Sequence, residues 1–323
     1  MAAFILRRIG QAILVMLAVG LIAFALFRYV GDPVIFMLGQ DATPEDRTRV
    51  TQQLGLDQPF YVQYARFVER ALHGEFGLSL RQVRPVSALI VERLPATLEL
   101  SFMAALFALS VGIPMGVYTA LRRNSWLSHV LLAVSLVGVS LPTFLIGILL
   151  IVLFAVYLGW LPSFGRGDTV MVGWWSTGFL TASGLKSLIL PSITLGLFQM
   201  TLIQRLVRSE MLEVLRTDYI RFARARGLTD RAVHFGHALK NTLVPVMTIT
   251  GLQLGAIIAF SIITEQVFQW PGMGLLFIQA INFADVPVMA AYLCLIGVFF
   301  VIINLAVDLL YYAVDPRLRL QPT

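Results

Sequence analysis

Long apolar runs constrain this chain more than any other feature, because each is long enough to cross a lipid bilayer. We identify six such runs, at about residues 9–30, 98–121, 130–160, 187–203, 243–263 and 286–311. Crossing a hydrocarbon layer of roughly 30 Å takes about 20 apolar residues in a helix that rises about 1.5 Å per residue. Because backbone polar groups in lipid must bond to one another, the runs predict six transmembrane helices.

Composition supports an all-α polytopic membrane protein. Hydrophobic residues make up 58% of the chain, charged residues 13%, and the mean hydropathy is +0.82. A soluble domain is about half apolar and about a quarter charged. The third run, residues 130–160, exceeds one simple crossing, so we expect a tilt, a bend at Pro142, or an end lying in the membrane interface.

Basic residues predict the orientation of the chain. They precede the first run, follow the second, fill the segment between the fourth and fifth, and end the chain, so all four groups fall on one side of a six-span zigzag. Cytoplasmic loops carry such an excess, so we expect both termini to be cytoplasmic. The net charge of +6 therefore reflects orientation rather than nucleic-acid binding. The first run continues past Ala23-Phe24-Ala25, which resembles a signal cleavage site, so we expect an uncleaved anchor.

The segment 31–96, between the first two runs, has the features of a folded external loop. Thr43 can cap a helix that has Pro44 at its first position, and Gly55 can end it. Apolar side chains then recur at helical spacing over residues 60–72. We predict an external helical loop that either covers the outer mouth or contacts a partner.

A basic segment, residues 205–242, separates the fourth and fifth runs and contains "TDYIRFARARGLTDRAVHFGHALK". It is too polar to span a membrane, and no proline interrupts it. Gly227 can end one helix, and Thr229 or Asp230 can cap the next. The pattern predicts a helix, a turn and a short second helix that project into the cytoplasm. A solvated loop that only sets orientation is the alternative.

The order of residues in several segments resembles one family. "DYIRFARARGL" and "HALKNTLVP" resemble the coupling loop of permease subunits of ATP-binding cassette importers, in the dipeptide, oligopeptide and nickel class. "GDPV", "RPVSALIVERLPATLEL", "LILPSITLG", "TEQVFQWPGMGLL" and "VDLLYYAVDPRLR" also resemble this family, in its order and spacing. The resemblance covers most of the chain.

That resemblance implies an importer in which two cytosolic ATP-binding subunits grip the coupling loop. It also implies a second, homologous permease and an external substrate-binding protein. The coupling residues would be Arg221, Ala223, Arg224, Arg226, Gly227, Leu228, Thr229 and Asp230. The family's general loop pattern begins Glu-Ala-Ala, with Gly four residues after the second Ala; here those positions read Arg221, Phe222, Ala223 and Gly227, so only the last two match.

Motifs for chemistry are missing from the sequence. "GFLTASGLKS" differs from a phosphate-binding loop, because five residues separate its glycines and Leu185 displaces Lys186. His234 and His237 have no third ligand nearby, and the single cysteine, Cys294, offers no disulfide. We therefore expect a chain that is not an enzyme and binds no metal or cofactor, with ATP and Mg on the partner subunits.

Three acidic residues, Glu99, Glu265 and Asp308, lie near the ends of apolar runs. Ionisable groups in lipid are costly, but water reaches the ends of spans easily. Pairing with a neighbouring arginine and a gating or substrate role both remain open. The glycine pairs Gly112/Gly116 and Gly251/Gly255 predict close approach of helices.

The resemblance thus implies a permease subunit that imports dipeptides or oligopeptides by alternating access. Glutathione-like compounds and nickel complexes are alternative solutes. A stand-alone secondary transporter would need its own ion site in mid-membrane and internal repeats, and no clear repeat is present. The predicted organisation is a first span in residues 1–30, the external loop in 31–96, and a five-helix core in 97–323 that contains the coupling loop.

Overall fold

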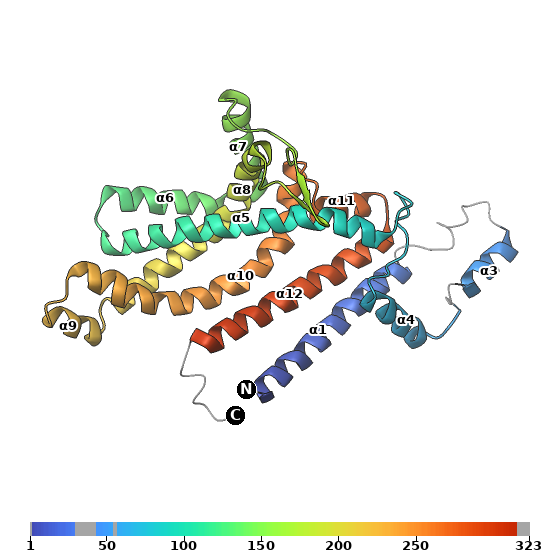
Figure 1. Ribbon diagram of the computed structural model, residues 1–323, viewed down its shortest axis with the longest axis horizontal. Helices are drawn as coiled ribbons and strands as arrows, with labels where there is room; N and C mark the ends of the chain where they lie inside the picture. The colour runs from blue at the N-terminus through green and yellow to red at the C-terminus, as the bar shows by residue number, and fades with distance from the viewer. Residues whose placement is uncertain (1, 30–42, 54–56, 315–323) are drawn as a thin grey trace. The chain divides into compact units, whose positions relative to one another are not determined.

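The computed structural model describes residues 2–29, 43–53 and 57–314, and most of them are helical (Figure 1). The chain divides into two compact units. Unit 1 comprises Met1–Pro95 with Gly272–Val301, and unit 2 comprises Ala96–Pro271 with Ile302–Thr323. The chain passes between the two units three times. Two of these boundaries lie inside long helices, one in α5 (Val86–Leu121) and one in α12 (Val286–Val314).

Four helices in the described part of the chain are long and apolar enough to cross a membrane. Their spanning segments are Arg8–Leu26, Val86–Leu121, Ala182–Val214 and Val286–Val307. A fifth candidate is the bent pair of Trp126–Ser140 and Thr143–Tyr157. The fold is therefore that of an all-α membrane protein with four or five candidate spans. The run 243–263 lies in α10 (Leu239–Val267), in which Gly255–Val267 is a shorter apolar segment.

The third apolar run breaks at Pro142, which is one of the three outcomes expected for it. Helix α6 (Trp126–Ser140) ends at Leu141, whose backbone is extended, because the residue before a proline avoids the helical region. Helix α7 (Thr143–Leu150) then begins and continues as the π-helix η1 (Ile151–Tyr157). The two segments are bent by 115°. We call α7 with η1 the arm.

In unit 1, aromatic rings join α1 (Ala2–Tyr29) to α4 (Phe60–Leu72). The ring of Phe24 lies 5.2 Å from that of Phe60 and 5.7 Å from that of Phe67, centroid to centroid. The hydroxyl of Tyr64 donates to the carbonyl oxygen of Leu17 at 2.6 Å. These contacts fix the second predicted helix of the external loop against the first span.

The first predicted helix of the external loop is α3 (Pro44–Gln53). Its cap matches the prediction, since the backbone N–H of Asp46 donates to Thr43 Oγ1 at 3.2 Å and Pro44 is the first helical residue. Gly55, the predicted end, lies outside the described residues.

A buried acid that the sequence did not single out ties two loops of unit 1 together. Asp285 follows α11 (Met273–Asn282) and is buried. Its carboxylate accepts hydrogen bonds from the hydroxyl of Ser79 and from the backbone N–H groups of Leu80, at 3.1 Å, and Arg81, at 3.4 Å. Three donors satisfy a carboxylate that would otherwise be costly to bury.

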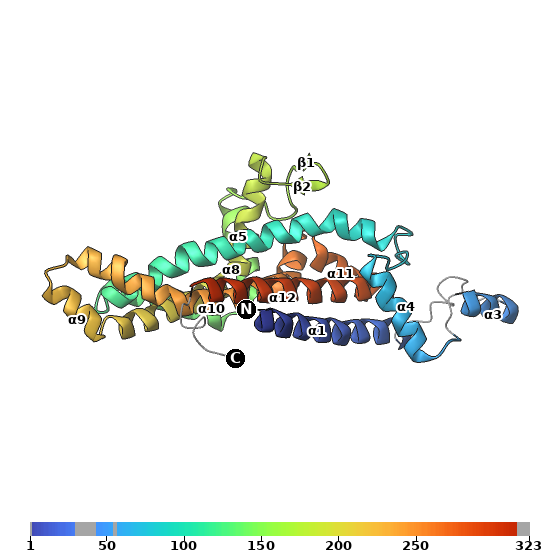
Figure 2. The ribbon, with the colours of Figure 1, turned by 60° about the horizontal axis from the view of Figure 1, so that its bottom comes forward.

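Unit 2 is built around α5, α8 (Ala182–Val214) and α10, which run side by side in both views (Figures 1 and 2). Toward one end, Leu100, Leu188, Ile257 and Trp270 form a buried cluster. A second cluster surrounds Val207 and Met211 and extends to residues of α9 (Asp218–Ala225). Continuous apolar packing therefore reaches from the bundle into the basic segment.

Glycines let α5 and α8 approach closely, as predicted for Gly112 and Gly116. A Cβ added at Gly116 would lie 2.6 Å from Val207 Cβ, and one at Gly112 would lie 2.8 Å from the carbonyl oxygen of Met200. Gly251 has the same property, because an added Cβ would lie 2.4 Å from Cγ2 of Val307 in α12. Only glycine fits at these crossings without a shift of the helices.

Candidate functional site

The basic segment, residues 205–242, forms a helical elbow, and we call it the basic elbow. Helix α8 extends to Val214, so the elbow's first part continues a candidate span without a break. Helix α9 (Asp218–Ala225) follows a short turn, and the chain then reverses into the π-helix η2 (Ala232–Ala238). In Figures 1 and 2 the elbow forms one end of unit 2.

The reversal depends on Gly227, whose φ is 79°. The backbone N–H of Gly227 donates to the carbonyl oxygen of Arg224 at 2.9 Å, and that of Leu228 donates to Ala223 at 3.3 Å. This pair of bonds is the Schellman motif, which needs a left-handed residue after the helix and favours glycine there. The predicted stop at Gly227 is therefore present in the structure.

A helix begins again after Gly227, and Thr229 caps its start. The backbone N–H of Ala232 donates to Thr229 Oγ1 at 3.4 Å, and that of Val233 donates to the carbonyl oxygen of Thr229 at 2.9 Å. We predicted a short second helix here; a helix does begin after the turn, as the seven-residue η2, but it does not end there. The helical chain runs through η2 directly into α10. The elbow thus connects two long helices, α8 and α10, through two rigid turns.

The elbow has a buried underside and an exposed outer face. Ile220, Ala223 and Val233 are buried in the apolar cluster of unit 2. On the outer face, Phe222, Leu228 and Phe235 expose 64%, 38% and 53% of their surface. Large apolar side chains exposed together on a surface are typical of protein–protein or membrane interaction sites.

The charged and polar residues predicted for coupling are exposed on the same elbow. Arg221, Arg224, Arg226, Thr229 and Asp230 are all exposed. Arg221 pairs with Asp218 at 3.2 Å, but both side chains are largely in solvent, and such a pair contributes little to stability. The guanidinium of Arg226 lies 5.9 Å from the ring centre of Phe222. Exposed arginines can form forked contacts with carboxylates of another protein.

Replacing Gly227 by Val should loosen the elbow, because a β-branched residue resists the left-handed backbone at a cost of roughly 1–2 kcal/mol. We expect trypsin to cleave the purified variant faster at the elbow's arginines than it cleaves the wild-type chain. Gly227→Asn is the matched control, since Asn tolerates this conformation. Equal cleavage rates for the Val and Asn variants would show that the turn does not depend on the glycine.

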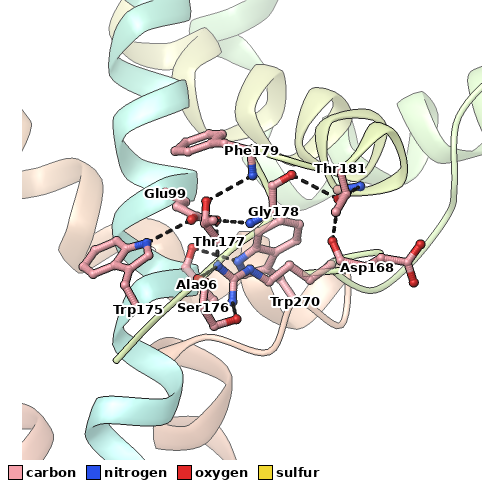
Figure 3. Close-up of polar contacts among 12 residues, drawn as sticks. Ala96, Glu99, Asp168, Trp175, Ser176, Thr177, Gly178, Phe179, Thr181 and Trp270 are labelled. Carbon is pink, nitrogen blue, oxygen red and sulfur yellow. Dashed lines mark hydrogen bonds and ion pairs between the residues drawn. The ribbon is translucent and has the colours of Figure 1, made fainter. Parts of the chain in front are cut away.

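Near the start of α5, away from the elbow, Glu99 forms a buried ion pair (Figure 3). Arg166 Nη2 donates to Glu99 Oε2 at 2.6 Å, and the two side chains expose only 7% and 1% of their surface. Trp175 Nε1 donates to Oε1 at 3.1 Å, and the backbone N–H of Gly178 donates to Oε2 at 3.2 Å. Pairing with an arginine was one of the two roles left open for Glu99, and the structure has such a pair, with protein donors in place of water.

These bonds attach the segment between the arm and α8 to helix α5. Arg166 also donates to the carbonyl oxygen and hydroxyl of Ser176, at 2.6 and 3.2 Å. Ser176 lies in β2 (Trp175–Thr177), which pairs antiparallel with β1 (Val170–Val172). One buried carboxylate thus holds a small hairpin on α5. No pattern in the sequence had predicted this hairpin.

Glu265 is fully buried in α10 and also faces protein donors. Its Oε1 accepts from Thr97 Oγ1 at 2.7 Å and from Ser261 Oγ at 3.1 Å. Beside it, Trp270 Nε1 donates to the carbonyl oxygen of Ala96 at 2.9 Å (Figure 3). Hydroxyl donors from α5 and α10 therefore join these two helices around the acid. Asp308 lies in α12, and its side chain is outside the described part of the structure.

The histidines, the cysteine and the carboxylates among the described residues do not gather at one place. Within them, no group of three or more His, Cys, Asp or Glu side chains could hold a metal ion. His234 and His237 both lie in η2. The described polar clusters around Glu99, Glu265 and Asp285 are ion pairs and hydrogen bonds that join separate segments of the chain.

Comparison with known proteins decides the family. The family of binding-protein-dependent transport system inner membrane components matches residues 112–320, and its N-terminal companion family matches residues 1–101. The chain belongs to this permease family. It is a multi-pass inner membrane component of an ABC-type transport system rather than an enzyme.

Curated relatives match the permease over nearly its whole length. It is 42% identical over 335 residues to the di/tripeptide transport system permease protein DppB of Pseudomonas aeruginosa, covering 99% of this chain and 100% of the relative. It is 40% identical over 336 residues to the dipeptide transport system permease protein DppB of Escherichia coli strain K12, covering 99% of each chain.

Among solved structures, an inward-facing methionine ABC transporter, MetNI, resembles the permease with a TM-score of 0.57 at 22% identity. The match covers 70% of this chain and 96% of that chain. At this identity the likeness concerns the fold alone.

Proposed function

We propose that this permease is one of two homologous permease subunits of an ATP-driven importer that carries peptides across the bacterial inner membrane. Six spans, with both termini in the cytoplasm, place residues 31–96 outside the cell and the basic elbow inside it. Two cytosolic ATPase subunits bind and hydrolyse ATP with Mg, and an external binding protein delivers the solute. The clustering of arginines next to the candidate spans supports this orientation.

The observation that carries the proposal is the exposed apolar face of the basic elbow. Phe222, Leu228 and Phe235 lie outermost on a segment whose underside is packed into unit 2. Aromatic anchors surrounded by arginines are typical of the centre of a protein interface. A partner ATPase with an apolar groove and acidic rim fits this face.

A rigid connection between the elbow and the bundle supports transmission of force. Val207 and Met211 of α8 share one buried cluster with Ile220 of α9 and Val233 of η2. The hydroxyl of Thr242 contacts the sulfur of Met211 at 3.6 Å, which joins the start of α10 to the end of α8. Closure of the ATPases would therefore move α8 and α10 together and open the pathway outward, and hydrolysis would reset it inward.

Peptides are the solute class that the relatives favour. Both relatives compared above are named as transporters of dipeptides or of di- and tripeptides. Glutathione-like compounds and nickel complexes would use the same machinery with another binding protein. Measuring which ligand the binding protein encoded beside this permease retains would distinguish them. Retention of a nickel complex and no peptide would contradict the peptide assignment.

Charge introduced on the elbow's outer face tests the proposed ATPase contact. We expect Phe222→Asp to weaken ATPase binding roughly thirtyfold, because loss of an interface anchor costs about 2 kcal/mol. The readout is the amount of ATPase that co-purifies with the affinity-tagged permease. Leu72→Asp is the matched control, since Leu72 is an exposed leucine on α4 of the external loop. Equal recovery of ATPase with both variants would contradict an elbow-bound ATPase.

A further inference from the structure

The segment that follows the arm, residues 158–181, buries a charged side chain and exposes apolar ones, which is the opposite of a hairpin in water. Its buried charge is inside, where Arg166 meets Glu99. Its apolar side chains are outside: all three residues of β1, Val170 to Val172, are exposed. Water would normally favour the opposite arrangement, with charges out and apolar groups in.

Large apolar side chains dominate the exposed surface of this segment. Trp160, Met171 and Trp174 expose 65%, 64% and 62% of their surface. Phe164, Val172 and Leu180 are also exposed. Trp174 follows Gly173, whose φ of 65° suits the first central position of a two-residue hairpin loop. The backbone therefore places a tryptophan at the tip of the hairpin.

Charge is missing from the exposed part of the hairpin. Residues 169–185 include no Asp, Glu, Lys or Arg. Asp168, just before them, accepts a hydrogen bond from the hydroxyl of Ser183 at 2.6 Å, and Lys186 follows on α8. A surface that docks a soluble protein reversibly usually carries a charged or polar rim. The hairpin offers only a few hydroxyls.

Both neighbours of the segment are candidate membrane elements. The arm before it is apolar throughout, and α8 after it is a candidate span. The arm turns by 115° from α6, so it runs more across the bundle than along it. Its inner side packs through Ile151 on Leu190 and Phe268. The chain therefore enters the hairpin segment from one apolar element and leaves it into another.

We infer that the hairpin, residues 169–180, is seated in the bilayer interface and that lipid covers its outer face. Tryptophan places its apolar ring in the acyl boundary and its N–H at the headgroups, which suits Trp160 and Trp174. The Glu99–Arg166 pair, with the bond from Trp175, holds the inner face of the hairpin on α5. The inference depends on the membrane assignment and not on the proposed solute or ATPase contact.

A spin label at the hairpin tests this seating in the intact transporter complex. Cys294 is the only cysteine, so Met171→Cys can be labelled in a Cys294→Ser background. The complex is reconstituted in vesicles of phosphatidylethanolamine and phosphatidylglycerol, and collisions of the label with oxygen and with a water-soluble nickel chelate are measured. Leu106→Cys, exposed on α5, is the lipid control, and Glu69→Cys, exposed on α4, is the water control.

We expect the label at position 171 to meet oxygen more often than the nickel chelate, as at position 106 and opposite to position 69. Preferential collision with the chelate would show a hairpin in water and overturn the inference. Protection from both reagents would show that protein, such as a second permease, covers the face, and would also overturn it. Protection that develops only when the external binding protein is added would overturn it in favour of that partner.

Discussion

Replacing Glu99 by Met should destabilise the permease by about 3–5 kcal/mol, the cost of leaving a buried charge without its partner. The variant leaves the guanidinium of Arg166 without its carboxylate partner, although the Arg166 side chain is only 7% exposed. It also removes the acceptor of the Trp175 indole N–H and of the Gly178 backbone N–H. Equilibrium unfolding of the purified chain in mixed micelles measures the loss.

The double variant Glu99→Met with Arg166→Met separates charge burial from packing. Replacing both members of a buried pair by apolar groups is often neutral or better, whereas removing one member is costly. We therefore expect the double variant to recover much of the lost stability. The part that came from the hydrogen bonds of Trp175 and Gly178 to Glu99 stays lost. A single variant that is as stable as the double one would show that the ion pair does not hold the hairpin on α5.

Replacing Gly116 by Ile should cost about 3 kcal/mol, the upper end of the usual range for overpacking. An added Cβ alone would lie 2.6 Å from Val207 Cβ and 2.8 Å from the carbonyl oxygen of Gln204. Neither atom is the end of a flexible side chain, so α5 and α8 would have to separate. Because α8 carries the basic elbow, we expect ATP-driven uptake to fall as well as stability.

Gly10→Ile is the matched control for this substitution. Gly10 lies in α1, and an added Cβ there meets nothing within 4 Å. Ile costs little in a helix and faces open space, so we expect stability close to wild type in the same micelle assay. Equal losses from both variants would mean that the effect comes from glycine replacement in general and not from the α5–α8 crossing.

Local rules in the sequence predicted the turns of this fold well. Pro142 restricts the residue before it, and the third apolar run breaks there. Thr43 and Thr229 both accept backbone hydrogen bonds as caps, and Gly227 has the left-handed backbone. Each of these features depends on a few neighbouring residues, so the printed sequence contains the whole signal.

Features that depend on distant residues could not be predicted in the same way. Arg166 is paired with Glu99 across 67 positions of the chain, and Asp285 bonds Ser79 across 206. Nothing local distinguishes these residues from exposed ones. The length of the helix after Thr229 was also missed, because the polar residues of η2 masked its continuity with the apolar α10.

We propose that the basic elbow is a rigid helical connection that a separate ATPase moves. Uptake of a labelled dipeptide into proteoliposomes tests it most directly, with both permeases, the ATPases and the external binding protein present. We predict uptake that requires ATP and that falls to the nucleotide-free level with Phe222→Asp, while Leu72→Asp retains the ATP requirement. Uptake by this chain alone, without nucleotide, would contradict the account.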